Sequence, residues 1–93
     1  MTIEITHVKY SGPRVTHESI VEFKWKNRET GAVASSTKQA LVTWVDEKTN
    51  IAFVGSGTQQ VRVASIHPGS TPAYLRTYAD DAWNNNLLAL PTF

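Results

Sequence analysis

Only one stretch of this sequence has the residue spacing of a helix. In residues 35–48, four side chains recur at the i, i+3, i+4 and i+7 positions of a single helix face. They are Leu41, Trp44, Val45 and Lys48. Ser35 or Ser36 would supply the N-cap oxygen. Threonines and valines lower the helix propensity here, so we expect burial of Leu41 and Trp44 against a sheet to supply most of the stability.

The first ten residues alternate as a strand does, with one interruption. Ile3 and Ile5 would share a face, and the alternation then changes phase because Val8 and Tyr10 have even numbers. A bulge near His7 would reconcile the two halves, because one extra residue reverses which positions face the core. A strand end that is covered on both faces would explain the change of phase as well.

Residues 18–26 alternate more regularly. Val21, Phe23 and Trp25 would occupy one face, and charged residues alternate with them on the other. We expect this strand to pair with the first one as a hairpin. The turn-forming residues 27–32 follow it.

The chain returns to strands after Asn50. Runs at 51–54, 59–67 and 73–78 are rich in β-branched and aromatic residues and are separated by turns that contain glycine and proline. In the long second run, Val61 and Val63 would face one way, and the other face would carry Arg62, Ala64 and Ile66. In the last run, Leu75 and Thr77 would face one way, and the other face would carry Tyr74, Arg76 and Tyr78.

Together these elements predict one domain of the α+β class, residues 1–93. The expected order is β-β-α-β-β-β. The expected architecture is an antiparallel sheet of about five strands with one helix packed on a face.

Composition restricts the classes of function. Nine Lys+Arg against eight Asp+Glu leave a net charge of +1, so no general field attracts duplex nucleic acid or an anionic membrane. The absence of cysteine excludes disulfides, thiolate zinc sites and a cysteine nucleophile. No apolar run approaches the roughly 20 residues that span a bilayer, and the N-terminus lacks a signal-peptide pattern. We therefore expect a soluble, cytoplasmic protein without membrane contact.

The C-terminal stretch YLRTYADDAWNNNLLALP, residues 74–91, resembles the C-terminal signature of a protein family. This family comprises small bacterial, archaeal and viral proteins, the domain of unknown function 3892. The early THESI, the helix with Trp44 and the chain length are similar as well, so the resemblance spans nearly the whole chain. It implies a fold type and a bacterial or viral setting, and it implies no activity.

Metal-binding patterns are weak in this sequence. His7, His17 and His67, together with Glu18, lack the spacing of known zinc motifs. Each histidine lies at a predicted strand end or in a turn, where a partly exposed imidazole is ordinary. We expect no metal and no cofactor.

Catalytic patterns are equally weak. Asp80 and Asp81 are adjacent, and neighbours on an extended segment point apart, so a turn-forming role is favoured over paired acid–base carboxylates. No nucleophile elbow, phosphate loop or dinucleotide fingerprint occurs. We expect no catalytic residue.

A binding function is better supported. We predict a ligand-binding set of Arg76, Arg62, Tyr74 and Tyr78. A guanidinium holds phosphate with two hydrogen bonds, and an aromatic face accepts a nucleobase by stacking. The competing interpretation is an ordinary outer strand face, on which Arg76 pairs with Asp80 or Asp81.

The working hypothesis is a small, non-catalytic homo-oligomer that sequesters an anionic, nucleotide-like ligand. It would act in the cytoplasm, which is that of the bacterial host cell if a phage encodes the chain. One alternative is a protein–protein interaction module that uses its sheet edge or the apolar tail, residues 87–93. A minor alternative is a nucleotide-cleaving enzyme. Binding to duplex nucleic acid is disfavoured because the helix offers only Lys38 and Lys48.

Overall fold

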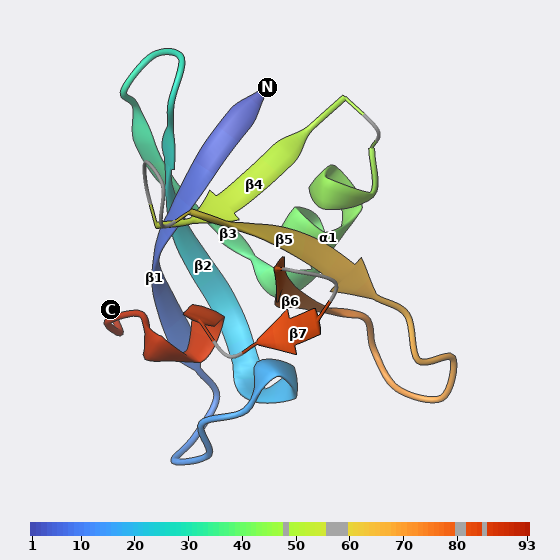
Figure 1. Ribbon diagram of the computed structural model, residues 1–93. Helices are drawn as coiled ribbons and strands as arrows, with labels where there is room; N and C mark the ends of the chain where they lie inside the picture. The colour runs from blue at the N-terminus through green and yellow to red at the C-terminus, as the bar shows by residue number, and fades with distance from the viewer. Residues whose placement is uncertain (48, 56–59, 80–81, 85) are drawn as a thin grey trace.

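The computed structural model describes residues 1–47, 49–55, 60–79, 82–84 and 86–93. The elements are β1 (Thr2–Tyr10), η1 (His17–Ser19), β2 (Ile20–Asn27), β3 (Val33–Thr37), α1 (Lys38–Asp46), β4 (Ile51–Val54), β5 (Val61–Ile66), β6 (Tyr74–Ala79), β7 (Ala82–Asn84) and η3 (Asn86–Ala89) (Figure 1). Both η elements are short 3₁₀ helices.

The strands form one twisted sheet in the order β3-β2-β1-β4-β5-β6-β7 (Figure 1). Neighbouring strands are antiparallel except β1 and β4, which run parallel. Helix α1 packs against β2, β3, β5 and β6. The α+β class with a single α-helix is thus confirmed for the described part of the chain.

The sheet has seven strands, more than the expected five, and it is mixed. Strand β3 uses residues expected to begin the helix, and β7 uses part of the stretch expected to be a turn. The parallel pair arises because the chain leaves β1, builds β2, β3 and α1, and then returns to the open side of β1. Parallel neighbours need such a long crossover, and a helix usually forms part of it.

The hairpin of β1 and β2 contains the bulge predicted near His7. The register shifts between Ile5 and His7, so Thr6 has no register partner on β2. The extra residue reverses the alternation, and Ile3, Ile5 and Val8 are all buried as a result. The prediction of a paired, bulged hairpin is confirmed.

The expected position of Val21 is wrong. A second register shift lies next to the loop that joins β1 to β2, and it leaves Val21 without a register partner on β1. Ile20 therefore joins Phe23 in the core, and Val21 is 39% exposed. A regular alternation in the sequence could not show this, because the shift depends on how β1 pairs with β2.

Helix α1 is capped by Thr37 and not by a serine. Thr37 Oγ1 accepts the Ala40 N–H at 3.3 Å. Ser35 and Ser36 belong to β3, whose pairing with β2 continues to Thr37. The Ser36 hydroxyl instead accepts the indole N–H of Trp25 at 3.0 Å.

The apolar stripe of α1 faces the core as predicted. Leu41 is buried, and Trp44 and Val45 pack against the core at its margin. Val42 is buried as well. Lys48, which the prediction included, lies outside the described residues.

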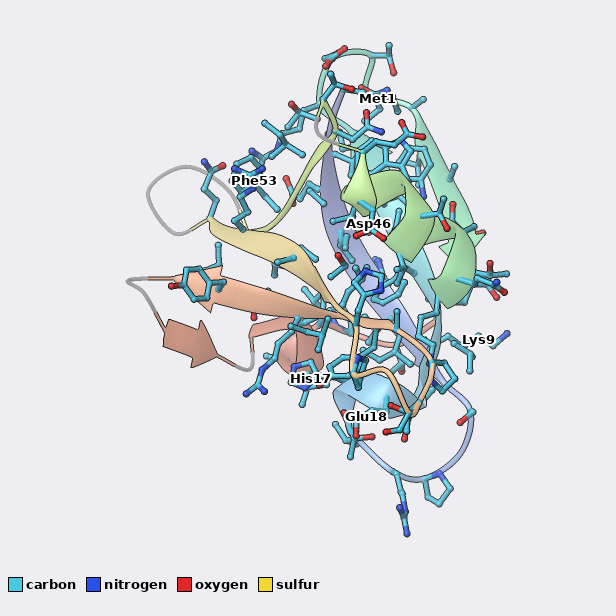
Figure 2. The ribbon with its side chains drawn as sticks, turned by 90° about the vertical axis from the view of Figure 1, so that its right-hand side faces the viewer. Met1, Lys9, His17, Glu18, Asp46 and Phe53 are labelled. Carbon is cyan, nitrogen blue, oxygen red and sulfur yellow. The ribbon has the colours of Figure 1, made fainter. Side chains whose placement is uncertain are left out.

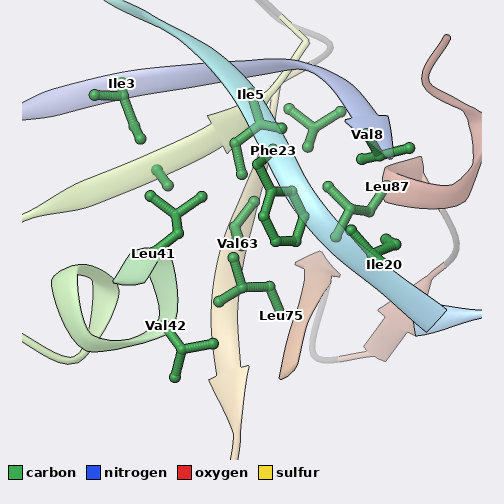
Figure 3. Packing of buried hydrophobic residues seen from close by; sticks show 12 residues of the cluster. Ile3, Ile5, Val8, Ile20, Phe23, Leu41, Val42, Val63, Leu75 and Leu87 are labelled. Atoms are coloured by element: carbon green, nitrogen blue, oxygen red, sulfur yellow. The ribbon is translucent and has the colours of Figure 1, made fainter. Parts of the chain in front are cut away.

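One hydrophobic core lies between the sheet and α1, and its residues come from most elements (Figure 3). They are Ile3, Ile5, Val8, Ile20, Phe23, Leu41, Val42, Ala52, Val54, Val63, Leu75 and Leu87. Burial of a side chain of this size contributes about 1.5–3 kcal/mol. The core therefore extends from the first strand to the C-terminal tail.

The tail completes the core beside β1. Figure 3 shows Leu87 of η3 next to Val8 and Ile20, and Leu87 is fully buried. The main chain then pairs with β1, because the Val8 N–H donates to the Pro91 carbonyl at 3.0 Å and the Phe93 N–H donates to the Val8 carbonyl at 3.3 Å. The tail is a structural part of the domain.

Among the described residues, no helix is both long enough and apolar enough to cross a bilayer.

Candidate ligand-binding face

The outer face of β5 and β6 contains all four residues of the predicted ligand-binding set. The antiparallel register pairs Arg62 with Tyr78, and it places Arg76 and Tyr74 further along the same face. Leu75 and Thr77 of β6 point the other way and are fully buried. The alternation read from the sequence is confirmed on both strands.

Arg62 lies in a row of side chains that crosses three strands. Phe53 of β4 is its register partner on one side and Tyr78 of β6 on the other. Adjacent strands are about 4.8 Å apart, so the side chains of these register partners start from neighbouring positions on the same face. We call Phe53, Arg62 and Tyr78 the aromatic–arginine row. Figure 2 shows Phe53 on the side of β4 that faces away from α1.

The row borders a shallow hollow. Its volume is about 360 Å³. Arg62, Ala64 and Tyr78 line it from the outer face, and Val45, Val63 and Ser65 line it from the α1 side, so it lies where the two faces meet. Arg62 is exposed and Tyr78 is 37% exposed, so both side chains are accessible from solvent. The ion pairs of the described residues join Arg28 to Glu4 and His67 to Asp46, and neither neutralises Arg62.

A second arginine covers the Phe53 end of the row. The Arg28 guanidinium lies 4.9 Å from the centre of the Phe53 ring. It donates to the Gly55 carbonyl at 2.7 Å and to Gln60 Oε1 at 2.6 Å, and it contacts Glu4 at 3.5 Å. These contacts fix Arg28 as a structural clamp over β4 and leave Arg62 as the cation that faces the hollow. Sequence reasoning missed both residues, because only the assembled sheet brings Phe53 beside Arg62 and places Arg28 over the Phe53 ring.

Arg76 and Tyr74 lie at the other, more covered end of the face. Two residues along a strand span about 7 Å, so Arg76 is about that far from Tyr78 and Tyr74 is twice as far. Both are half-buried. The Tyr74 ring lies 6.3 Å from the ring of His17, centre to centre, at a tilt of 31°. Arg62 and Tyr78 are therefore neighbours in the sheet, whereas Tyr74 packs against η1.

His17 is buried and not, as expected, a partly exposed turn histidine. Its residue exposure is 7%. Burial lowers the pKa of His17, and the positive charge of Arg76 lowers it further, whereas Glu18 acts in the opposite direction. Nε2 of this imidazole has no hydrogen-bond partner among the described residues. The neutral imidazole is the form that suits this environment.

The third predicted histidine takes part in a different cluster. Asp46, at the end of α1, accepts hydrogen bonds from Ser65 and from His67, whose Nε2 is 3.1 Å from Asp46 Oδ1. These bonds, that of Ser65 first, lower the pKa of Asp46. A catalytic triad needs the hydroxyl bonded to the imidazole. Here both donors converge on the carboxylate, which ties β5 to α1.

The cluster borders a wider hollow of about 560 Å³ between α1 and the loop after β5. Its lining includes Lys38, Thr43, Asp46, His67 and Pro72. The Lys38 ammonium donates to the Glu18 main-chain carbonyl at 3.0 Å, so it holds η1 against α1.

The other chemical candidates do not assemble. No group of three or more metal-binding side chains forms within the described ranges. His7 bonds to its neighbour Thr6 at 2.9 Å. Asp80 and Asp81 lie outside the residues that the structure describes.

A family model matches residues 4–91 of the chain, and the family is described as "Protein of unknown function (DUF3892)". No curated protein and no solved structure matches the chain.

Proposed function

We propose a function for this chain, which belongs to the DUF3892 family, from the geometry of its own side chains. The protein is a non-catalytic binding protein that holds a small anionic, nucleotide-like ligand on the outer face of β4, β5 and β6. The observation that supports this most directly is the aromatic–arginine row, in which Arg62 lies between Phe53 and Tyr78.

The chemistry of the row suits a nucleotide. Arg62 offers a positive charge and several N–H donors to a phosphate group. A nucleobase can stack on the Tyr78 ring while the phosphate lies against Arg62, since these side chains are register partners. The hollow of about 360 Å³ beside them is of the size that small ligands occupy.

The covered end of the face would support the site and not contact the phosphate. Arg76 is half-buried next to His17, and Tyr74 packs on the His17 ring. We therefore assign phosphate binding to Arg62 first, and we give Arg76 and Tyr74 the role of positioning β6.

If a phage encodes this chain, a protein with such a face could act in the cytoplasm of the bacterial host by sequestering a nucleotide signal. Release of an unchanged nucleotide after denaturation of the loaded protein would distinguish this sequestration from cleavage. The formation of a homo-oligomer stays a prediction, and sedimentation analysis would test it.

The proposal is tested by calorimetric titration with a panel of mononucleotides and cyclic dinucleotides. Arg62→Ala should weaken the tightest interaction about tenfold or more, because a hydrogen bond to a charged group contributes about 1.5–3 kcal/mol. Tyr78→Leu should also weaken it, because the stacking surface is lost.

Arg14→Ala is the matched control, since Arg14 is an exposed arginine in the loop between β1 and η1. It makes the same change of charge away from the row and should leave the affinity unchanged. Equal losses in Arg62→Ala and Arg14→Ala, or no binding by the unmodified protein, would overturn the proposal.

The alternative function, a protein–protein interaction module, would use either the sheet edge or the apolar tail, and the structure favours the edge. The apolar tail is occupied by the core, because Leu87 is fully buried and residues 91–93 pair with β1. The sheet edge at β3 is open among the described residues. Between the tail and this edge, the edge is therefore the surface that is available to a protein partner.

A further inference from the structure

Strand β3 is an edge strand without the usual protection against pairing. Its sequence, VASST, contains no charged residue and no proline, and its register with β2 is regular throughout. Natural edge strands commonly carry lysine, proline or a bulge, which prevent another strand from pairing. Val33, at its start, is 58% exposed.

The hydrogen-bond ladder leaves main-chain groups of β3 directed outward. The Asn27 N–H donates to the Ala32 carbonyl at 2.8 Å, which fixes the phase of the β2–β3 ladder. Residues that exchange hydrogen bonds with β2 then alternate with residues that point away from it. Ala34 belongs to the first kind, and Val33 and Ser35 belong to the second. Their N–H and C=O groups face the open edge.

A small apolar hollow lies next to this edge on the core side of the sheet. Its volume is about 210 Å³. Its lining consists of Ile3, Trp25, Ser36, Ala40, Leu41 and Trp44, and we call it the tryptophan hollow. Both indole rings are partly buried, and the bond from Trp25 to Ser36 fixes one of them. Tryptophans in such positions are frequent anchors of protein interfaces.

The opposite side of the same edge is basic. Lys26 and Lys24 of β2 are the register partners of Val33 and Ser35, so they lie on the outer face. Glu22 is the acidic residue of β2 on that face, and it lies at the far end, opposite Thr37. Glu4 is the β1 partner of Lys26, and its carboxylate contacts Arg28.

The geometry points to β3 as a docking edge for an extended peptide segment of the form acidic–apolar–acidic. The segment adds to the sheet by hydrogen bonds to the main chain of Val33 and Ser35. Its central residue then lies opposite Ala34 and faces the tryptophan hollow. Its two flanking residues face outward on the side of Lys24 and Lys26, where carboxylates are favoured.

A second copy of this chain fits the edge less well. Two β3 strands paired with each other would place only Ala34 or Ser36 beside the hollow, and both are too small to fill it. They would also bring no acidic residue to the lysines, because β3 itself has none. The partner is therefore a different sequence.

This inference rests on the interaction-module alternative and not on the nucleotide-binding face. The two surfaces are separated in the sheet, because β2 and β1 lie between the edge strand β3 and the strands β4 to β6. Arg62→Ala should leave peptide binding unchanged, and a variant at the tryptophan hollow should leave nucleotide binding unchanged. Failure of one proposal is thus distinguishable from failure of the other.

The test uses the full chain and a synthetic peptide with the central sequence TDFDT, blocked at both ends. Titration should change the intrinsic tryptophan fluorescence in a saturable way, because the Phe side chain enters next to Trp25 and Trp44. Peptides with TDGDT or TKFKT at the centre should bind at least about tenfold more weakly, since each removes one of the two recognised features.

Ala40→Glu is the informative variant. Ala40 is exposed at the third position of α1, where the partial positive charge of the helix N-terminus favours an acidic side chain, so the fold should persist. The introduced carboxylate would occupy the hollow and repel the acidic peptide. Gln39→Glu adds the same charge in the same turn but borders the other hollow, next to α1 and the loop after β5, and should bind the peptide normally.

Three results would overturn the inference. One is the absence of a saturable fluorescence change up to millimolar TDFDT peptide. Another is equal binding by Ala40→Glu and Gln39→Glu. The last is a dimer in sedimentation equilibrium that Ala40→Glu dissociates and the peptide does not, which would assign the edge to a second copy.

Discussion

At the scale of single residues, His17 couples the fold to pH. It is the buried imidazole of η1, and its pKa is lowered by burial and by Arg76 beside it. In the unfolded chain this histidine titrates near 6.5. The unfolded state therefore binds a proton at a higher pH than the folded state does.

The sign of the effect follows from this difference. As the pH falls below about 6.5, protonation of His17 favours the unfolded state, so the free energy of unfolding decreases until the folded pKa is reached. His17→Gln should flatten this part of the stability profile. Chemical denaturation at a series of pH values from about 5 to 8 measures it.

His67→Gln is the control for the pH series. His67 is an exposed histidine, so the same substitution at this position should leave the slope of the stability profile close to that of the unmodified protein. A His17→Gln profile with an unchanged slope would contradict the assignment.

The sequence could not place His17 in the interior. The residues around His17, with the sequence THES, are typical of a surface turn. Burial comes from β6, which is more than fifty positions away and packs on η1. A contact that far apart in sequence leaves no local pattern, so the prediction of an exposed imidazole failed.

At the scale of elements, the N-cap of α1 shows that strand pairing can decide which of several suitable residues caps a helix. Three hydroxyl residues, Ser35, Ser36 and Thr37, precede the helix, and each is a suitable N-cap type. Pairing of β3 with β2 keeps the serines extended and moves the cap to Thr37. Sequence periodicity located the helix itself correctly, because its apolar stripe is a local property.

A single substitution can measure how much the Thr37 N-cap contributes to the free energy of unfolding. Thr37→Ala should lower the free energy of unfolding by about 1 kcal/mol, because the Ala40 N–H loses its acceptor. Ser35→Ala, at an exposed position of β3, should have little effect. A larger loss for Ser35→Ala than for Thr37→Ala in urea denaturation would refute this assignment.

At the scale of the whole molecule, the C-terminal tail is required for the fold. Leu87→Ala should lower the free energy of unfolding by about 2–5 kcal/mol, the usual cost of such a cavity in a core. Leu90 is only partly buried, so Leu90→Ala should cost less. Denaturant midpoints measure both variants, and a loss for Leu87→Ala well below about 2 kcal/mol would contradict its place in the core.

A loss of this size is large compared with the total free energy of unfolding of a small domain, which is typically about 5–15 kcal/mol. Truncation after Leu87 would also remove the pairing of residues 91–93 with β1. A loss of partner binding in such a truncation would therefore report unfolding and not an interaction site.

The topology also decides how much of the binding face could be predicted. Alternation within β5 and β6 placed Arg62, Arg76, Tyr74 and Tyr78 on one face, and the structure confirms that placement. It could not show that β4 would return beside β1 and bring Phe53 next to Arg62. Register between strands is set by the assembled sheet, so the aromatic–arginine row became visible only in three dimensions.

The most direct test of the binding face is a map of amide chemical shifts during titration with the tightest nucleotide of the panel. We expect saturable changes concentrated at Phe53, Arg62 and Tyr78 and their strand neighbours, and the loss of these changes in Arg62→Ala. Changes concentrated instead along α1 and the loop 67–73, or the absence of saturable changes, would contradict it.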